Sequence, residues 1–279
     1  MANKATVTRS NDTSRRTLTS PLKWAGGKRW IVPTLREHFE PYKGSRLVEP
    51  FCGGLSVALG LEPKTALLND INPLLMGFYK NLKRGLDINL RVKNDEGYYY
   101  RMRERLNRHL RAKRFDDPEA SALFLALNKS CFNGLVRFSV DKETGVMRFN
   151  VPFGKYSSIN IPSDLSEYKT ALRGWSLSCK DFARLSIRSS DILYLDPPYD
   201  HQGTGFTEYA GGKFSWEDQV RLAHWAVSHN VPTIISNHNT PRIRELYRDL
   251  GFTLSTVKVR RSIGAKSRKS ASEIIATSL

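Results

Sequence analysis

The feature that most constrains the fold of this chain is a short apolar run that ends in Asp-Pro-Pro-Tyr. Residues 192–195 have the composition of a buried strand, and Asp196, Pro197, Pro198 and Tyr199 follow it directly. Open α/β sheets bind ligands at the carboxyl ends of their strands. Because proline has no N–H, we expect both proline carbonyls to be left free to accept hydrogen bonds, beside a carboxylate and an aromatic ring. This set suits a planar ligand with an NH2 group, such as a nucleobase, although a proline-stiffened loop with a solvated Asp would have the same sequence.

The chain is strongly basic. It has 44 Lys and Arg against 27 Asp and Glu, for a formal net charge of +17. Such a surface favours a polyanionic partner. A basic tail or a role at an anionic membrane would also explain the charge, but we find no basic amphipathic helix with a broad apolar face, so nucleic acid is favoured. With 279 residues, of which 40% are hydrophobic, the chain can bury one sizeable core and carry an inserted subdomain.

The cysteines argue against both a disulfide framework and a zinc site. Cys52, Cys131 and Cys179 are odd in number and lack C-x-x-C spacing. They predict a reducing, cytoplasmic environment and no bound metal. The first 20 residues lack the apolar segment of a signal peptide, and no run approaches the roughly 20 apolar residues that span a bilayer. We therefore expect no membrane association.

Hydrophobic patterning predicts an α/β domain interrupted by an insert. Strands are expected at 46–50, 65–68, 177–179, 192–195, 233–236, 253–259 and 273–277. Helices are expected at 57–61, 74–83, 216–229 and 241–250, with Ser215 as an N-cap and Asp218 three positions later. Residues 86–172 are expected to form the insert, with an Arg-rich helix near 101–114, an apolar helix at 123–127 and an irregular, turn-rich segment at 130–161. Residues 1–20 are expected to be a disordered basic arm.

Two further patterns predict a nucleoside-binding site. A glycine turn follows Glu49, and Asp70 closes the next strand, where an acid can bind ribose hydroxyls. The strict G-x-G-x-x-G is missing, and Glu49 would repel a pyrophosphate, so a cationic nucleoside such as S-adenosylmethionine fits better. Trp24, two glycines and Lys28 offer a stacking ring and a partner for a carboxylate. The alternatives are a helix-capping Asp70, and a core Trp24 beside solvated lysines.

An ordered set of motifs makes residues 21–277 resemble the DNA adenine methyltransferases of the Dam type, within the D12 class. The motifs are Pro-Leu-Lys-Trp-Ala-Gly-Gly-Lys from 21, Val-Glu-Pro-Phe from 48, Asn-Asp-Ile-Asn from 69, Leu-Asn-Lys-Ser-Cys-Phe-Asn-Gly-Leu-Val-Arg from 127, Asn-Val-Pro-Phe-Gly-Lys-Tyr from 150, Asp-Pro-Pro-Tyr from 196, Val-Pro-Thr-Ile-Ile-Ser-Asn-His from 231 and Val-Lys-Val-Arg-Arg-Ser-Ile from 257. Any one of them is modest, but the ordered set is highly specific.

The resemblance implies a doubly wound, Rossmann-like S-adenosylmethionine-dependent methyltransferase sheet with an inserted, mainly helical target-recognition domain. The methyltransferase domain would span 21–85 plus 173–279, and the recognition domain 86–172. The partner would be double-stranded DNA, with no obligate protein partner and a monomeric state in solution. Rivals are a modification enzyme paired with a restriction nuclease, a DNA-binding regulator without catalysis, and an RNA or protein amide methyltransferase.

The resemblance also implies roles at the cofactor and chemical sites. Trp24 would stack on the cofactor adenine, Lys28 would pair with its methionine carboxylate, Asp70 would hold the ribose, and Asp181 would reach the adenine edge. The cofactor set is completed by Glu49, Phe51, Phe182 and Asp196. The catalytic residues would be Asp196, Pro197 and Tyr199.

The DNA-binding roles implied by the resemblance lie in the insert and beside Lys23. Phe132, where many relatives carry Tyr, would enter the stack vacated by a flipped adenine. Arg137 would contact guanine, Leu135 and Pro152 a thymine methyl, and Lys23 the outer guanine of 5′-GATC. Asn133 and Tyr156 complete the expected DNA-binding set. The Arg-rich helix and a basic loop at Lys266, Arg268 and Lys269 are expected to contact phosphates, although a plain solvated helix is nearly as good an explanation of the former.

Overall fold

The computed structural model describes residues 17–90, 92–141, 143–162, 164–200, 214–260 and 270–279, with side chains described up to 257 and again from 272 in the last two strands. Most of the expected basic arm and the loop with Lys266, Arg268 and Lys269 lie outside the described residues. Among the described helices, none is long and apolar enough to cross a bilayer.

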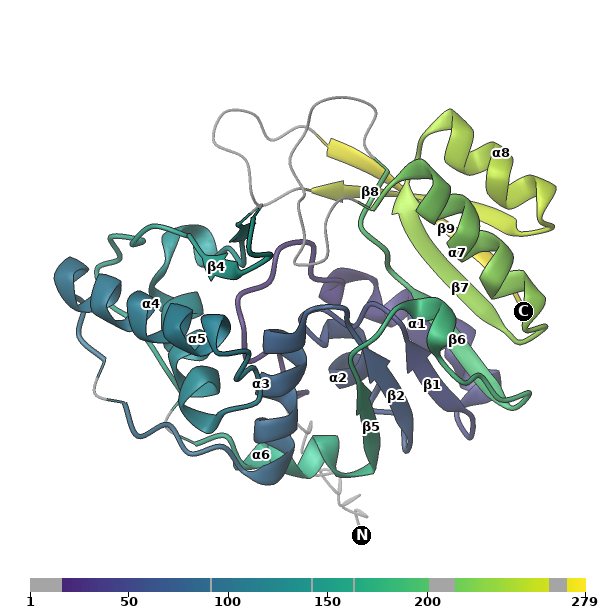
Figure 1. Ribbon diagram of the computed structural model, residues 1–279. Coiled ribbons are helices and arrows are strands. Elements are labelled where there is room, and N and C mark those ends of the chain that lie inside the picture. Colours follow the sequence, from purple (N-terminus) through teal and green to yellow (C-terminus); the bar gives the residue numbers. More distant parts are fainter. Residues whose placement is uncertain (1–16, 91, 142, 163, 201–213, 261–269) are drawn as a thin grey trace, which may run out of the picture.

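The centre of the molecule is a seven-stranded sheet in the order β5-β2-β1-β6-β7-β9-β8 (Figure 1). Its strands are β1 (Arg46–Glu49), β2 (Ala66–Asn69), β5 (Trp175–Ser178), β6 (Asp191–Leu195), β7 (Thr233–His238), β8 (Thr253–Arg260) and β9 (Ser270–Ser278). The first five strands of the sheet, β5, β2, β1, β6 and β7, are parallel to one another, whereas β9 runs antiparallel to both β7 and β8. The chain order reverses between β1 and β6, and the space at such a switch point is where doubly wound folds bind ligands.

Helices cover both faces of this sheet. The α-helices are α1 (Val32–Phe39), α2 (Ser56–Leu61), α3 (Pro73–Arg84), α4 (Glu96–Arg111), α5 (Pro118–Ser130), α6 (Ser166–Ala171), α7 (Trp216–Ser228) and α8 (Pro241–Asp249). The 3-10 helices are η1 (Arg29–Ile31), η2 (Glu40–Tyr42), η3 (Phe132–Gly134), η4 (Leu172–Gly174) and η5 (Phe182–Arg184).

Alternation along the strands divides the core into two clusters. In β6, Ile192 and Tyr194 join the cluster with α1, α2 and α3, whereas Leu193 and Leu195 join the cluster with α7 and α8. Successive side chains of a strand point to opposite faces, so this fully buried strand needs apolar residues on both. The predicted doubly wound α/β fold is therefore confirmed.

The insert packs directly on the first of these layers. Helix α5 lies against α3 and α4, and its apolar residues Leu123, Phe124 and Leu127 belong to the same cluster as Leu47 and Ile192 of the sheet. One hydrophobic core therefore runs from the sheet into the insert.

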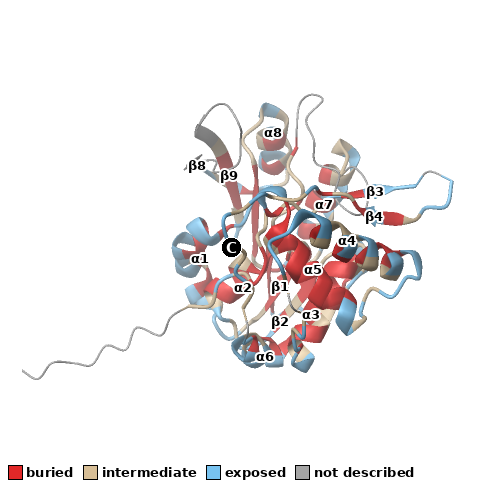
Figure 2. Ribbon diagram, turned by 90° about the vertical axis from the view of Figure 1, so that its left-hand side faces the viewer, coloured by how far each residue is buried: buried red, intermediate tan, exposed pale blue. Residues whose placement is uncertain are grey.

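The segment expected to be irregular contains a β-hairpin. Strands β3 (Phe138–Val140) and β4 (Met147–Phe149) pair antiparallel. The buried Phe138 and Phe149 face each other with ring centroids 5.7 Å apart, and the side chain of Asp141 accepts hydrogen bonds from Thr144 in the turn. Three-residue strands carry too little alternation to be recognised among turn residues. Figure 2 shows the hairpin reaching outward, with an exposed tip.

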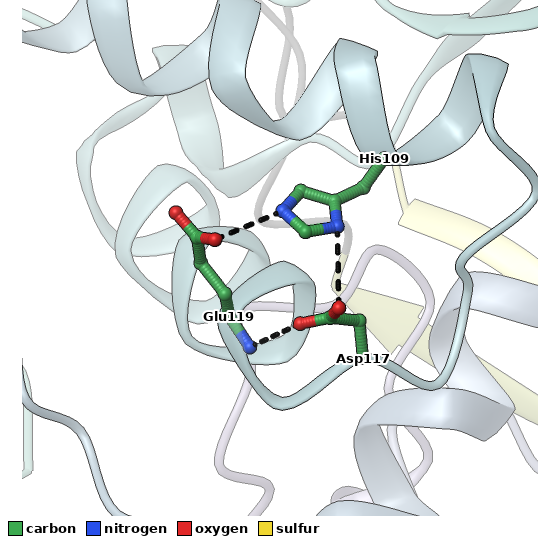
Figure 3. Close-up of side chains that lie close together, drawn as sticks. All are labelled: His109, Asp117 and Glu119. Atoms are coloured by element: carbon green, nitrogen blue, oxygen red, sulfur yellow. Dashed lines mark hydrogen bonds and ion pairs between the residues drawn. The ribbon is translucent and has the colours of Figure 1, made fainter.

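A small polar cluster joins α4 to α5. One ring nitrogen of His109 lies 3.2 Å from Glu119, and the other lies 3.7 Å from Asp117 (Figure 3). Each carboxylate therefore faces a different edge of the ring, an arrangement that suits a link between helices better than a shared metal ion. Asp117 also caps α5 through the Glu119 amide.

Candidate functional site at the carboxyl ends of the strands

Asp196 lies just beyond β6, at the switch point of the sheet. Its Oδ1 accepts a 2.8 Å hydrogen bond from the Ser236 hydroxyl and lies 3.2 Å from the Lys28 ammonium. Lys28 is 5% exposed and the Asp196 side chain 20%. The structure thus brings together two residues that came from separate motifs. Both contacts are made by Oδ1 of this carboxylate.

The two prolines are held by a buried polar network that sequence reasoning missed. The Gln219 side-chain amide donates a 2.7 Å hydrogen bond to the Pro198 carbonyl, and Asn237 in turn donates to Gln219 and to the Tyr247 hydroxyl. The expectation that both proline carbonyls are free is therefore wrong for Pro198. Gln219 and Asn237 are polar residues at buried positions of a helix and a strand, a signal that becomes readable only once burial is known.

Tyr199 is anchored at its hydroxyl. The phenol donates a 2.7 Å hydrogen bond to Glu273 of β9, and the ring centroid lies 4.9 Å from that of His238. Burial, followed by the charges of Asp196 and Glu273, raises the pKa of this hydroxyl, so it stays a donor. Glu273 was not among the expected site residues.

Glu49 ends β1 beside Asp196. It is 3% exposed, and its Oε1 is buried with no hydrogen-bond partner among the described residues. Burial, and then the nearby Asp196 charge, raises the pKa of this carboxyl well above its ordinary value. A buried carboxyl oxygen without a partner is costly, so a cationic ligand at this edge would relieve the cost.

The glycine turn after β1 fits closely against Trp24. A Cβ on Gly53 would lie 2.7 Å from the indole nitrogen, and one on Gly54 would lie 2.7 Å from the Trp24 Cβ. Glycine is therefore required here by the tryptophan as well as by any ligand. The Gly53 amide also donates to Asp70, whose other oxygen accepts from the Asn72 amide. Burial raises the pKa of Asp70 to about 6.

Asp181 and Phe182 lie at the start of η5, after β5. The Phe182 ring packs 5.7 Å from that of Phe51, and the Arg221 guanidinium lies over it. Both oxygens of Asp181 accept hydrogen bonds from Arg221, at 2.7 and 2.9 Å, and this contact lowers the pKa of the carboxyl. Asp181 therefore has a cationic partner within the chain itself.

The residues expected to read DNA form a second group around η3. Phe132 is 49% exposed, and its amide donates to the Pro152 carbonyl. Asn133 adopts a φ of 53° in this turn. The Arg137 Nε donates to Asn150 at 2.9 Å, and Leu135 is partly buried against the core. Two segments expected to contact DNA, 131–137 and 150–154, therefore lie side by side.

Lys23 and Tyr156 contact each other and the backbone of residues 129–131, next to this group. The Lys23 ammonium donates to the Lys129 carbonyl and lies 3.9 Å from the centre of the Tyr156 ring. The Tyr156 hydroxyl donates to the Cys131 carbonyl. In addition, Asn128 bonds both the amide and the carbonyl of Lys23. The motif that carries Trp24 and Lys28 is thereby attached to the insert.

The sequence from 24 to 263 matches the model of one family, the D12 class N6 adenine-specific DNA methyltransferases. The chain belongs to this family. It is therefore an adenine-specific DNA methyltransferase of the D12 class, as the motifs predicted.

Curated relatives agree with this membership of the D12 class. The chain is 34% identical to the DNA adenine methylase of Escherichia coli K12 over 91% of its own length and 93% of that protein. It is 34% identical to the retron Ec67 DNA adenine methylase of Escherichia coli, over 92% and 90%. It is also 34% identical to a DNA N-6-adenine-methyltransferase of Escherichia phage P1 over 88% of its length, but spans only 33% of that longer protein.

Proposed function

We propose that this protein transfers the methyl group of S-adenosylmethionine to the exocyclic nitrogen of an adenine flipped out of duplex DNA, within 5′-GATC. The observation that carries the proposal is that Lys28 contacts both Asp196 and Tyr199 at the edge of the sheet where Glu49 ends β1, while Lys23 of the same motif lies against Gly134 in the segment that carries Phe132 and Arg137. Such a reaction belongs in the cytoplasm of a bacterium or of a phage-infected cell.

The donor set fits S-adenosylmethionine. Glu49 offers a buried, unpaired carboxylate oxygen to a positive charge, Asp70 offers acceptors to ribose hydroxyls, and the Trp24 indole lies against the glycine turn between them. A pyrophosphate would instead meet two carboxyl groups. When bound, S-adenosylmethionine supplies an electrophilic methyl on a sulfonium.

The residues of the chain act mainly on the adenine. Its amino nitrogen is a poor nucleophile because the lone pair is delocalised into the ring. Asp196, its orientation set by Ser236, would accept an amino hydrogen and favour a pyramidal nitrogen, with the Pro197 carbonyl as the second acceptor. Tyr199 would stack on the base, which helps to offset the few kcal/mol of flipping. Most of the acceleration would then come from orientation and from stabilising positive charge on the nitrogen.

No covalent intermediate on the protein is needed. The thiols of Cys52 and Cys131 are buried, and burial raises the pKa of Cys131 to about 12 and that of Cys52 well above its ordinary value. Neither cysteine is therefore disposed to act as a nucleophile.

Sequence reading is assigned to the second group. Asn150 holds the Arg137 Nε, and neither Nη group of Arg137 has a partner among the described residues. A guanidinium held in this way can present two donors to guanine O6 and N7. Leu135 and Pro152 would contact a thymine methyl, and Phe132 would enter the vacated stack.

The decisive experiment is transfer of a tritiated methyl from S-adenosylmethionine to three duplexes. One contains GATC, the second has a scrambled centre, and the third carries methylated adenine on both strands of GATC. Label in the first alone supports enzyme, base and sequence together. Label in the first two would remove the GATC assignment, and label in none, with DNA and cofactor bound, would favour a non-catalytic regulator.

A paired substitution tests the reading role. Arg137→Ala should reduce the ratio of kcat/KM for GATC to that for single-base variants about 10-fold or more, since a bidentate contact contributes about 1–3 kcal/mol of discrimination. The matched control is Arg148→Ala, an exposed arginine of the same hairpin. This substitution should lower kcat/KM for all duplexes by the same factor. An unchanged ratio for Arg137→Ala would reassign that residue to general phosphate binding.

A further inference from the structure

Glu273 enters the site from an unexpected direction. It belongs to β9, which runs antiparallel beside β7, with Glu273 opposite His238. The residue is 6% exposed. Charged side chains are rarely buried this deeply without a specific partner, so its place at the carboxyl end of β7 calls for a role.

The contacts of Glu273 connect three distant parts of the chain. Its Oε2 accepts the 2.7 Å hydrogen bond from Tyr199, 74 positions earlier, and lies 4.0 Å from the Lys28 ammonium. That ammonium also lies 4.6 Å from the centre of the Tyr199 ring and 3.2 Å from Asp196. The Lys28 ammonium thus lies between two carboxylates and over the Tyr199 ring, and it also donates a 3.0 Å hydrogen bond to the Gly26 carbonyl.

This geometry bears on how the ring of Tyr199 is held. A ring packed only on its faces can still tilt and rotate, whereas a ring bonded at its far end is fixed at both ends. The apolar body of phenylalanine would offer a base the same stacking face. The hydroxyl therefore adds orientation, and its acceptor is Glu273.

We propose that Glu273 is a positioning residue for methyl transfer. It fixes, through the hydrogen bond from the Tyr199 hydroxyl, the ring against which the adenine stacks. The inference rests on the proposed function. It assigns to the C-terminal strand a part in catalysis that none of the sequence motifs at the site predicted.

The test compares Glu273→Ala, Glu273→Gln, Tyr199→Phe and the double variant Glu273→Ala/Tyr199→Phe. Single-turnover methylation of a GATC duplex is measured at saturating S-adenosylmethionine and DNA, together with the Kd for the cofactor. We expect Glu273→Ala and Tyr199→Phe each to slow the rate at least about 10-fold with little change in cofactor Kd, because misorientation acts on the chemical step. The double variant should be no slower than the slower single variant, since both remove one interaction.

The glutamine variant separates positioning from mere folding. Its side-chain oxygen can still accept from the Tyr199 hydroxyl, so it should recover most of the rate lost in Glu273→Ala. Circular dichroism confirms that each variant is folded, and if the alanine variant does not fold, the glutamine and phenylalanine variants still decide. Additive losses in the double variant, or a folded Glu273→Ala with the wild-type rate, would overturn the proposal.

A second measurement is independent of activity. In protein labelled with 13C-tyrosine, the Tyr199 resonance is the one that disappears in Tyr199→Phe. It should shift in Glu273→Ala and stay close to its wild-type position in Glu273→Gln. A wild-type protein that shows this resonance pattern but methylates no duplex would remove the proposed function and the catalytic meaning of Glu273 with it. An active wild type with an unmoved resonance in Glu273→Ala would remove the Glu273 proposal alone.

Discussion

At the scale of single residues, burial shifts two acids of this site toward their neutral forms. Glu49 and Asp70 are both acids whose pKa burial raises. Each would be more stable ionised if a cation or a hydroxyl donor were added. Asp181 differs, because Arg221 already supplies its partner and lowers its pKa. The site therefore has two acids disposed toward a ligand and one already paired.

The pKa of Asp70 predicts a pH dependence of cofactor binding. The free protein carries a pKa of about 6 there, and the ionised form is the better acceptor for ribose hydroxyls. The contribution of Asp70 to the affinity should therefore be constant well above pH 6 and fall as the pH drops through 6, by at most about 10-fold per pH unit. Calorimetric titration of S-adenosylmethionine between pH 5 and pH 8 measures this. Because the pKa of Glu49 is raised as well, the control is Asp70→Asn. This variant should bind S-adenosylmethionine more weakly, and its affinity should depend less on pH. Equal wild-type affinity at pH 5 and pH 7 would contradict the role of Asp70.

Phe132 provides a second prediction for a single residue. Phe132→Ala should lower kcat/KM for GATC duplex about 10- to 100-fold, because base stacking on an aromatic ring contributes about 1–3 kcal/mol. Val140→Ala is the matched control. Val140, at the end of β3, is also an exposed apolar residue, at 54% against 49% for Phe132, but it has no expected contact with the stack. Equal effects of the two substitutions would show that general apolar contact, and not stacking, is what matters.

At the scale of elements, close backbone packing decides how α3 meets the insert. Gly77 of α3 faces the turn between α4 and α5, and a Cβ there would lie 2.1 Å from the Phe115 carbonyl oxygen. The neighbouring Asn81 donates a 2.8 Å hydrogen bond to the Asp116 carbonyl. A glycine that weakens α3 as an isolated helix therefore permits the contact on which the insert rests.

Two glycine-to-alanine substitutions should consequently change the free energy of unfolding in opposite directions. Alanine is favoured in helices by about 1 kcal/mol, but Gly77→Ala must displace backbone, and overpacking costs about 1–3 kcal/mol. We expect a net loss of stability for Gly77→Ala. Gly97→Ala in α4, where the nearest atom would be at an ordinary 3.4 Å, should be neutral or stabilising. Urea unfolding of both variants measures the difference, and a stabilised Gly77→Ala would show that the turn can yield.

At the scale of the whole molecule, the insert and the sheet share one core. The cluster that contains Leu47 of β1 continues through α3 into α5 and the hairpin. The division at 86 and 172 stays a prediction about function, since no apolar boundary separates the two parts there. A basic protein of +17 also keeps several acids inside, among them Glu49, Asp191, Asp200 and Glu273, which leaves the surface still more cationic.

A shared core predicts one cooperative unfolding transition. All five tryptophans, at 24, 30, 175, 216 and 225, lie outside the insert, whereas α4 and α5 contribute much of the helical signal. Tryptophan fluorescence and far-ultraviolet circular dichroism should therefore give coincident urea curves. If ellipticity is lost before fluorescence changes, the insert unfolds by itself and the two parts are separate folding units.

The sequence alone determined what depends on neighbours along the chain. Apolar runs predicted the strands of the main sheet to within a few residues, Ser215 and Asp218 form the expected capping box, and the ordered motifs identified the family. These features follow from local periodicity, from caps and from residue order. The strands β3 and β4 were not predicted, because an alternation of apolar and polar residues cannot be recognised over three positions.

Only the tertiary structure decided which distant groups meet. Lys28 on Asp196, Gln219 on the Pro198 carbonyl and Glu273 on Tyr199 join residues from different elements. Such contacts depend on strand order and on which face of each helix is buried. A strand that pairs antiparallel at β7 places Glu273 opposite His238, and no local pattern along 270–279 contains that information. The chemistry of each residue is thus determined by its type, whereas its partner is determined by the packing of the sheet.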